Sequence, residues 1–510
     1  MIGTSFGEWV FIRLSIAFFR YTPLIYIFLI FFLPIVQPVE TIFPALCVLL
    51  AALLAELVYY LFIYRPFLGR LKRDAVHPPS LSRKEREALF ERCFGNVSEP
   101  DIYLRWWFLD ADPHEIRRDN VREFILWAFF ERPDGEELVD EDGETVEEEV
   151  EHYLRRLERR LGRPLKAGRG NAKSLRLTLD GITTTYRSLP WYVIIFIVDQ
   201  ATHLAFRWHG FEFYRRPRAS ALRVFPPRPQ ELYPGRQSPS SRLSYWHRPH
   251  TAQDKLPVVF FHGIGIGLWT YVRFLAGLHE TDDGSGSVGV IALEILPISF
   301  RLTPAIPDKA EFLTQMTTIL DHHRWEKFAL VSHSYGSVLT THMLHDSRLK
   351  HRVPSIVLID PVTIMLHLPD VAYNFTRRKP KRANEWQLWY FASTDPGVAL
   401  CLGRHFFWRE NILWKEDLLG TQDDGRRTRH AAVTLSGRDL IVDTATVAEY
   451  LGVDLESRVR GVVAESHNGV EVVMFPTLDH AQVFDDRSSR DSVIRMVKSR
   501  CESQWITSPV

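Results

Sequence analysis

A serine between small residues, at the end of an apolar run, is the first candidate for chemistry in this chain. Residues 328–336 read Phe-Ala-Leu-Val-Ser-His-Ser-Tyr-Gly, and a helix is expected over 337–344. A strand, a tight turn and a helix in this order can hold a serine hydroxyl above a sheet in a strained conformation, provided that the residues two before and two after it are small. Ser332 and Gly336 meet that requirement. Ser334 is therefore the candidate nucleophile, with an ordinary strand-to-helix loop as the alternative for so short a motif.

Serine is a poor nucleophile at neutral pH, so this chemistry also requires a general base and an acid that orients it. His480 is the candidate base, because it follows the last predicted strand in Phe-Pro-Thr-Leu-Asp-His. Asp439 is the candidate acid, because it follows Leu-Ser-Gly-Arg in a turn after the preceding strand. Asp360, in Leu-Ile-Asp-Pro at the end of the strand after the serine turn, is the alternative acid.

A fourth requirement is a pair of donors for the oxyanion that forms during acyl transfer. Residues 260–265 read Phe-Phe-His-Gly-Ile-Gly and end the first predicted strand of the sheet. The backbone amides of Ile264 and Tyr335 are the candidate oxyanion hole. The side chain of His262 is expected to be structural in its loop. Glu294 is predicted either to reach the pocket or to pair with Arg301.

Short apolar runs alternate with helical stretches from Leu256 onward, which is typical of a mostly parallel sheet covered by helices. Strands are predicted at 258–261, 288–295, 328–331, 355–359, 431–435 and 470–475. An insertion at about 361–430 is rich in Trp and Phe and is expected to cover the carboxyl ends of the strands as a cap.

The segment from Leu256 to the C-terminus, 256–510, resembles the α/β-hydrolase superfamily. His-Gly-Ile-Gly, Ser-His-Ser-Tyr-Gly, Ser-Gly-Arg-Asp and Leu-Asp-His occur in the order and strand context of that family. The resemblance implies an α/β fold with a doubly wound, mostly parallel sheet and an inserted cap, and a Ser-His-Asp hydrolase or acyltransferase. The chain departs from the family pattern at Ser332, where glycine is usual.

The N-terminus, residues 1–73, is predicted to form a membrane hairpin. Residues 21–36 and 43–64 are apolar segments with the length and composition of transmembrane helices. Arginines and a lysine flank the pair on its outer sides, and the connector carries none, so the positive-inside rule places both ends and the catalytic domain in the cytosol. Glu56 interrupts the second segment and is expected to face the partner helix or the membrane interface. A buried helical pair of a soluble domain is the alternative.

Residues 74–218 are charged with helical periodicity and are predicted to form a helical domain. Its aromatic-rich stretch 106–130 is expected to pack as a core, with a hydrophobic ligand or the membrane as the alternative. The apolar run 191–198 is too short to span a bilayer and is expected to be buried or interfacial. Residues 219–255, which contain a Pro-, Ser- and Arg-rich stretch, are predicted to be a linker.

The composition excludes several classes of function. The 510 residues carry 62 Lys plus Arg and 62 Asp plus Glu, so the net charge of zero gives no reason to expect a nucleic-acid partner. The four cysteines lie far apart and fit no metal spacing, and neither a metal nor a cofactor is expected.

These observations predict a multi-pass, membrane-attached serine hydrolase that cleaves a carboxylic ester or thioester through an acyl-enzyme on Ser334. The expected partners are the bilayer and a hydrophobic or lipid-like substrate, because aromatic surfaces of this kind are costly in water and useful beside a membrane. An acyltransferase with the same triad is one alternative. A non-catalytic lipid-binding scaffold that retains the fold is another.

Overall fold

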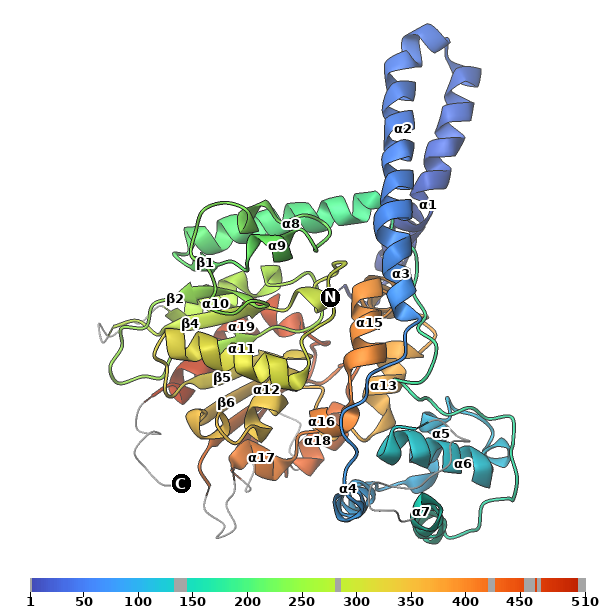
Figure 1. Ribbon diagram of the computed structural model, residues 1–510, viewed down its shortest axis with the longest axis vertical. Coiled ribbons are helices and arrows are strands. Elements are labelled where there is room, and N and C mark those ends of the chain that lie inside the picture. Colours follow the sequence, from blue (N-terminus) through green and yellow to red (C-terminus); the bar gives the residue numbers. More distant parts are fainter. Residues whose placement is uncertain are drawn as a thin grey trace.

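A nine-stranded, mostly parallel sheet is the framework of the C-terminal half of the chain (Figure 1). The computed structural model describes residues 2–132, 145–279, 286–420, 427–453, 464–465 and 469–502. The strand order is β1-β2-β4-β3-β5-β6-β7-β9-β8. The strands from β4 to β9 pair in parallel with one another, and antiparallel strands extend the sheet at both edges. The doubly wound, mostly parallel sheet expected from the sequence is therefore confirmed.

All six predicted strands are present. They are β3 (Val258–Phe261), β4 (Val290–Glu294), β5 (Ala329–His333), β6 (Ser355–Ile359), β7 (His430–Ser436) and β9 (Val470–Phe475). They were recognisable as continuous apolar runs because helices bury both of their faces. Helices α10 (Val272–His279) and α19 (Arg487–Arg500) pack on one face, and α11 (Lys309–His322) and α12 (Gly336–His345) lie on the other (Figure 1). A short strand, β8 (Ala464–Glu465), extends the sheet beside β9.

The predicted cap at 361–430 is a helical insertion between β6 and β7, whose residues 421–426 lie outside the described part of the chain. Its helices are α13 (Pro369–Thr376), α14 (Ala383–Leu388), α15 (Pro396–His405), α16 (Trp408–Asn411) and α17 (Lys415–Leu419). Helix α18 (Thr444–Tyr450) follows β7.

Two long helices form a hairpin that projects from the rest of the molecule (Figure 1). They are α1 (Phe6–Val36) and α2 (Val39–Tyr59), and the second continues through a π-helical turn (Tyr60–Tyr64) into α3 (Arg65–Leu71). Helix α1 and the continuous helix 39–71 are both longer than the predicted segments, because their bases pack against the folded domain. Ile12, Ile16 and Phe19 of α1 and Phe67 and Leu71 of α3 are buried, whereas the outer parts of the hairpin expose apolar side chains. By length and composition, α1, the helix 39–71 and a third helix, α8 (Leu189–Trp208), could each cross a membrane.

A separate helical unit lies beneath the cap and has its own core. Its helices are α4 (Arg83–Gly95), α5 (Pro100–Trp107), α6 (Arg118–Ile125) and α7 (Val146–Leu161), and a π-helical turn (Leu126–Phe130) follows α6. Most of the aromatic-rich stretch 106–130 is buried there, including Trp107, Phe124 and Trp127. The expectation of a core is therefore met, but Trp107 and Trp127 also line a cavity described below.

The predicted boundaries at 74–218 and 219–255 are wrong, because both segments contribute to the hydrolase-like sheet. Helix α8 and strand β1 (Glu212–Tyr214) pack on the sheet domain, and the supposed linker contains α9 (Arg218–Ala221) and strand β2 (Ser244–Arg248), which pairs with β4. The apolar run 191–198 is the first part of α8, and the helix continues through Asp199 to Trp208. Composition suggested a break at Asp199, but that carboxylate is turned inward and paired.

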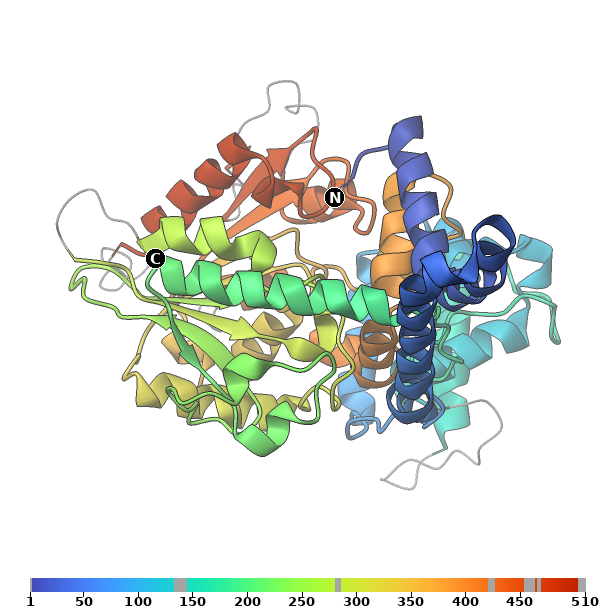
Figure 2. The ribbon, with the colours of Figure 1, turned by 90° about the horizontal axis from the view of Figure 1, so that it is seen from above.

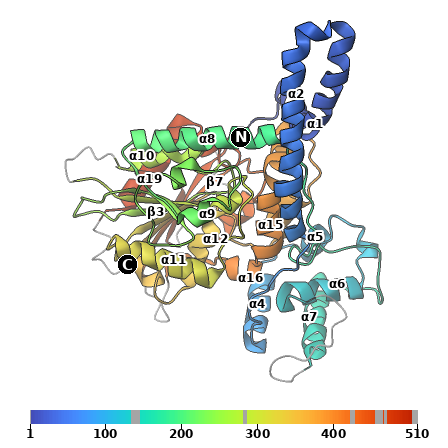
Figure 3. The ribbon, with the colours of Figure 1, turned by 45° about the horizontal axis from the view of Figure 1, so that its top comes forward.

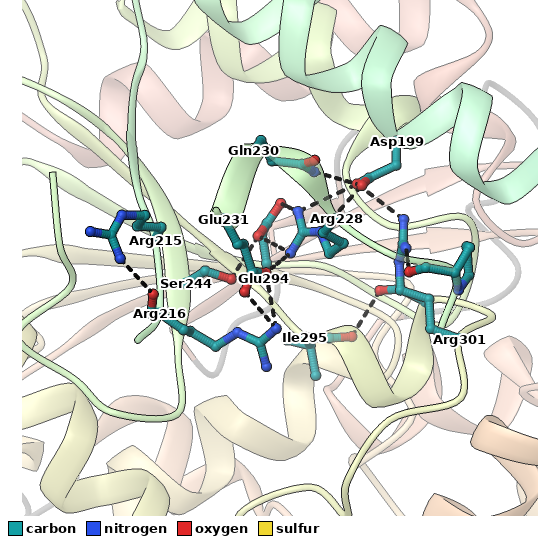
Figure 4. A network of polar contacts seen from close by, with 12 residues as sticks. Asp199, Arg215, Arg216, Arg228, Gln230, Glu231, Ser244, Glu294, Ile295 and Arg301 are labelled. Atoms are coloured by element: carbon teal, nitrogen blue, oxygen red, sulfur yellow. Dashed lines mark hydrogen bonds and ion pairs between the residues drawn. The ribbon is translucent and has the colours of Figure 1, made fainter. Parts of the chain in front are cut away.

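A buried network of charges joins these misassigned segments to the sheet (Figure 4). Arg228 donates to both carboxylate oxygens of Glu294 at 2.7 and 2.8 Å, to Glu231 at 2.7 Å, and to Asp199 of α8 at 3.2 Å. Arg301 pairs with Asp199 at 3.0 Å. Glu294 therefore pairs with Arg228 and not with Arg301, and it does not line the cavity that contains Ser334.

Replacing Arg228 with methionine should destabilise the fold strongly, because three carboxylates would stay buried without their common partner. The expected loss is about 3–5 kcal/mol of unfolding free energy, as found when one member of a buried pair is removed. Arg236→Met is the matched control, because the Arg236–Glu212 pair is exposed and should contribute little. Thermal unfolding of the full chain in detergent would compare the two, and equal unfolding temperatures would contradict a structural role for the network.

Candidate active site

Ser334 lies at the sharp turn between β5 and α12. Its φ of +51° is in the left-handed region, which costs a non-glycine residue free energy. The turn is held from both sides, because the Ser334 amide donates to the Ile359 carbonyl of β6 at 3.0 Å and Ser337 Oγ donates to the Ser334 carbonyl at 2.6 Å. The strained serine predicted from the sequence is therefore present.

The two small neighbours of the turn are required by close packing. A Cβ atom on Gly336 would lie 2.3 Å from the Phe261 carbonyl oxygen. Ser332, which replaces the usual glycine, is fully buried, and its Oγ accepts a hydrogen bond from Thr340 at 2.9 Å. The hydroxyl group of Ser332 is therefore tolerated at this position, because Thr340 of α12 donates a hydrogen bond to it.

His480 lies between Ser334 and Asp439. Its Nε2 is 2.8 Å from Ser334 Oγ, and its Nδ1 is 2.6 Å from Asp439 Oδ2. The second carboxylate oxygen of Asp439 accepts from the amides of Ile441 and Val442 at 2.7 and 3.0 Å, which fixes its orientation. The structure thus brings the three residues selected from the sequence into one hydrogen-bonded chain.

Asp360, the alternative acid, binds backbone instead of the imidazole nitrogen. Its oxygens accept from the Ser436 amide at 2.8 Å, from Ser436 Oγ at 3.0 Å and from the Ala481 amide at 3.1 Å. It therefore ties the ends of β6 and β7 to the loop that carries His480. Burial and the nearby charge of Asp439 raise the pKa of Asp360 to about 6, against the opposing effect of His480.

Three carboxylates also act on His480. Burial alone would lower its pKa, but the charge and hydrogen bond of Asp439, with smaller contributions from Asp360 and Asp479, raise the pKa of His480 to about 9. Asp479 itself turns away from the imidazole, and accepts from the amides of Leu440 and His480 and from Asn384 Nδ2. These hydrogen bonds fix the shape of the loop that carries His480.

The loop after β3 faces the serine turn. The Gly263 amide donates to Tyr271 Oη at 3.2 Å and the Gly265 amide to the Ile298 carbonyl at 3.2 Å. The amides of Ile264 and Tyr335 donate to no other group among the described residues, which leaves them available to an oxyanion. His262 is structural as expected: the Ile295 amide donates to its Nε2 at 2.9 Å, and burial lowers its pKa to about 4.

Asp360, Asp439 and His480 offer ligand atoms within 4.8 Å of one another. Carboxylates and an imidazole are common metal ligands. Here, however, both imidazole nitrogens already face Asp439 and Ser334, and the Asp360 oxygens accept three hydrogen bonds. Hydrogen bonding within the protein accounts for the cluster.

A sequence profile for the α/β-hydrolase fold matches residues 257–409. This match covers β3 to the cap, and the parallel sheet, the strained serine turn and the following histidine complete the pattern. The C-terminal domain has the α/β-hydrolase fold. A search of curated protein sequences gave no match.

Several solved structures resemble the hydrolase at low identity. A bacterial membrane phospholipase A is 11% identical, and the alignment covers 61% of this chain and 94% of that one with a TM-score of 0.37. A carboxylesterase from Bacillus subtilis is 12% identical over 59% of this chain and 98% of its own, with a TM-score of 0.33. A lipase structure from Acinetobacter baumannii is 10% identical over 59% and 94%, with a TM-score of 0.36. Similarity at this level carries no information on substrate.

Ser334 lines a narrow apolar cavity of about 60 Å³. The hydrolase domain lines it with Ile264 and Tyr335, and the cap lines it with Phe375, Leu402, Phe406 and Phe407. The helical unit adds Trp107 and Trp127. Two more open grooves, of about 670 and 810 Å³, run along α5 and along residues 169–183, but neither is lined by Ser334. We assign the narrow cavity to the site because it alone among these three contains the serine.

Sequence reasoning missed a link between the oxyanion loop and the serine turn. Tyr271 Oη accepts from the Gly263 amide and lies 2.7 Å from His333 Nδ1, and His333 immediately precedes Ser334. Both side chains are buried. A histidine beside the serine was visible in the motif, but nothing in the spacing indicated a tyrosine 62 residues earlier as its partner.

Gly263→Ala should impair the site, whereas Gly265→Ala should not. A Cβ on Gly263 would lie 2.7 Å from both His333 Nδ1 and Ser334 Cβ, so the loop would have to move away from the serine. A Cβ on Gly265 would meet no atom within 4 Å. The rate of fluorophosphonate labelling should fall by about 10²-fold or more in the first variant, the usual size of a lost oxyanion donor. Equal labelling rates in folded samples of the two variants would contradict this account of the loop.

Proposed function

We propose that this hydrolase is a membrane-attached serine esterase that cleaves a carboxylic ester or thioester of a hydrophobic substrate. The observation that carries the proposal is the chain of contacts from Ser334 through His480 to Asp439 at an apolar cavity. Such a chain activates serine as a nucleophile because the imidazole accepts its proton and the carboxylate stabilises the resulting imidazolium.

The reaction has two steps. Ser334 Oγ attacks the carbonyl carbon while His480 Nε2 accepts the hydroxyl proton, and the amides of Ile264 and Tyr335 donate to the oxyanion. The bond to the leaving oxygen or sulfur then breaks, His480 returns its proton to that atom, and an acyl-enzyme remains. Water attacks the acyl-enzyme with His480 again as base, which releases the acid and restores Ser334.

Two features support an apolar, membrane-derived substrate. The cavity wall is mainly aliphatic and aromatic, so a polar acyl group would lose hydration without compensation. The exposed, apolar outer parts of α1 and α2 match a bilayer and not water, since soluble proteins rarely expose so large an apolar surface. With the arginines at its base, the proposed topology places the hydrolase domain on the cytosolic side.

Labelling with a fluorophosphonate probe tests the nucleophile. The wild-type protein in detergent or nanodiscs should be labelled, and Ser334→Ala should not. Ser332→Ala is the matched control, because Ser332 is buried against Thr340 and should leave labelling intact. If a properly folded wild-type protein is not labelled, the hydrolase proposal is wrong. If labelling persists in Ser334→Ala, Ser334 is not the nucleophile.

The variants Asp439→Asn and Asp360→Asn should show which of the two carboxylates orients His480. Loss of the Asp439 carboxylate removes the orientation and charge stabilisation of the imidazole and should lower kcat by about 10³–10⁴-fold. Asp360→Asn should cost about tenfold or less in kcat but should lower the unfolding temperature, because three buried hydrogen bonds lose part of their acceptor, each worth about 1–3 kcal/mol when unsatisfied. The reverse order of kcat losses would make Asp360 the acid.

The pH profile gives a third test. Only neutral His480 can act as base, so kcat/KM should rise with pH as the imidazole, with a pKa raised to about 9, loses its proton. Asp360→Asn removes a negative charge that favours the imidazolium, so the pKa of His480 should fall and the acid limb of the profile should move to lower pH. An acid limb that stays in place, or moves up, would show that Asp360 does not act on the imidazole.

A further inference from the structure

Helix α8 presents an apolar face that the fold leaves uncovered. Trp191, Tyr192, Ile195, Thr202 and Phe206 form the buried face of the helix, and the first two also contact Phe19 of α1 and Tyr59 of α2. The opposite side exposes a stripe at helical spacing: Val193 48%, Ile194 39%, Ile197 57%, Leu204 69% and Trp208 88%. Side chains of this size and exposure are unfavourable in water, so the stripe requires a partner.

The inner face shows that α8 cannot serve as a third membrane span in this fold. Asp199, in the middle of the helix, pairs with Arg228 at 3.2 Å and with Arg301 at 3.0 Å, and it accepts from Gln230 Nε2 at 2.6 Å (Figure 4). Crossing a bilayer would move this carboxylate into hydrocarbon and leave two buried guanidinium groups without their partner, which is strongly unfavourable. The length and hydropathy of α8 therefore need another explanation.

The base of the hairpin is joined directly to the start of α8. Both carboxylate oxygens of Glu56, on α2, accept from the Leu189 amide at 2.9 and 3.0 Å, so the carboxylate caps the positive end of α8. On the other hairpin helix, the Phe19 carbonyl accepts from the Ser188 amide at 3.1 Å, and Thr22 Oγ1 lies 3.0 Å from Ser188 Oγ. These contacts hold the hairpin and α8 in one fixed relation.

As a result, α8 starts at the base of the hairpin and extends away from it over the sheet domain (Figures 1 and 3). Seen along the hairpin, α8 runs from the hairpin out over the hydrolase domain, and apart from the hairpin no described element is drawn above it (Figure 2). The exposed stripe therefore faces the side from which the hairpin rises. A bilayer crossed by α1 and α2 would meet the stripe along its length, about 30 Å for 20 residues.

We propose that α8 is an in-plane membrane helix whose exposed stripe lies in the interface of the bilayer that the hairpin enters. The inference rests on the proposed membrane attachment and adds a second contact, which fixes the orientation of the hydrolase domain. The partner is a lipid surface, because the stripe continues the apolar surface of the hairpin and its exposed positions carry no charge before Arg207. Trp208 near that end suits the headgroup boundary, as does Trp269, which is 46% exposed and belongs to a turn (Trp269–Tyr271) that contacts α8.

The test places a fluorophore on the stripe of the full-length protein in nanodiscs. Cys47 is exposed and is replaced by serine, because Cys93, Cys401 and Cys501 are buried. Single cysteines at Ile197→Cys and Leu204→Cys carry the probe, and Ile102→Cys, 48% exposed on α5 far from the hairpin, is the matched control. Leu24→Cys on α1, 60% exposed, reports on the hairpin itself.

Lipids that carry a quencher at a shallow or a deep position supply the readout. Probes at 197 and 204 should each lose at least about half of their fluorescence with shallow quenchers and less with deep ones, as for helices buried about 5–10 Å in the interface. The probe at 102 should be unaffected, and the probe at 24 should be quenched by the deep lipid.

Three outcomes would overturn the inference. Probes at 197 and 204 that behave like the one at 102, while position 24 is quenched, would leave the hairpin in the membrane and α8 in water. Stronger deep than shallow quenching at 197 or 204 would place the helix in the hydrocarbon core. An unquenched position 24 would remove the membrane attachment itself. The readout is independent of turnover, so an inactive protein would fail the esterase proposal without affecting this one.

Discussion

The buried guanidinium of Arg228 is the interaction on which the arrangement of the N-terminal half depends. It joins α8 through Asp199, the segment before β2 through Glu231, and the central sheet through Glu294. An arginine in this environment is stable only while all of its donors are engaged, so the three elements must assemble together. Glu56 of α2 and Phe19 of α1 accept hydrogen bonds from backbone amides at the start of α8, so the position of α8 also fixes the position of the hairpin.

Around the serine, strain and charge are distributed over several elements. The left-handed backbone of Ser334 persists because β6 and α12 bond its amide and its carbonyl, and the imidazole is held by a carboxylate that two backbone amides orient. Asp360 is close enough to raise the pKa of His480 without touching its ring nitrogens. The two acids that the sequence left as alternatives thus have different geometric roles, one facing the imidazole and one joining strand ends to the His480 loop.

The sequence predicted the parts of the molecule in which one local signal decides the structure. Strands buried on both faces read as apolar runs, and a serine turn, a terminal histidine and a post-strand aspartate have fixed places along such a sheet. Strand β2 (Ser244–Arg248), which lies between β1 and β4, and the full length of α8 were not predicted. Their polar residues have partners that are distant in sequence: Ser244 donates to Glu294, and Asp199 accepts from Arg228. The contact between Tyr271 and His333 could not be predicted for the same reason, because the two residues are 62 positions apart in the sequence.

Trp107 and Trp127 reach the cavity from a helical unit that has its own core and supplies none of the triad. The wall and the reacting groups are therefore encoded by separate stretches of the chain. Substitutions in α5 or in the turn after α6 can reshape the far end of the cavity while the hydrogen bonds of His480 stay as they are. In evolutionary terms, the residues that shape the cavity wall and the residues that contact Ser334 can therefore change independently of one another.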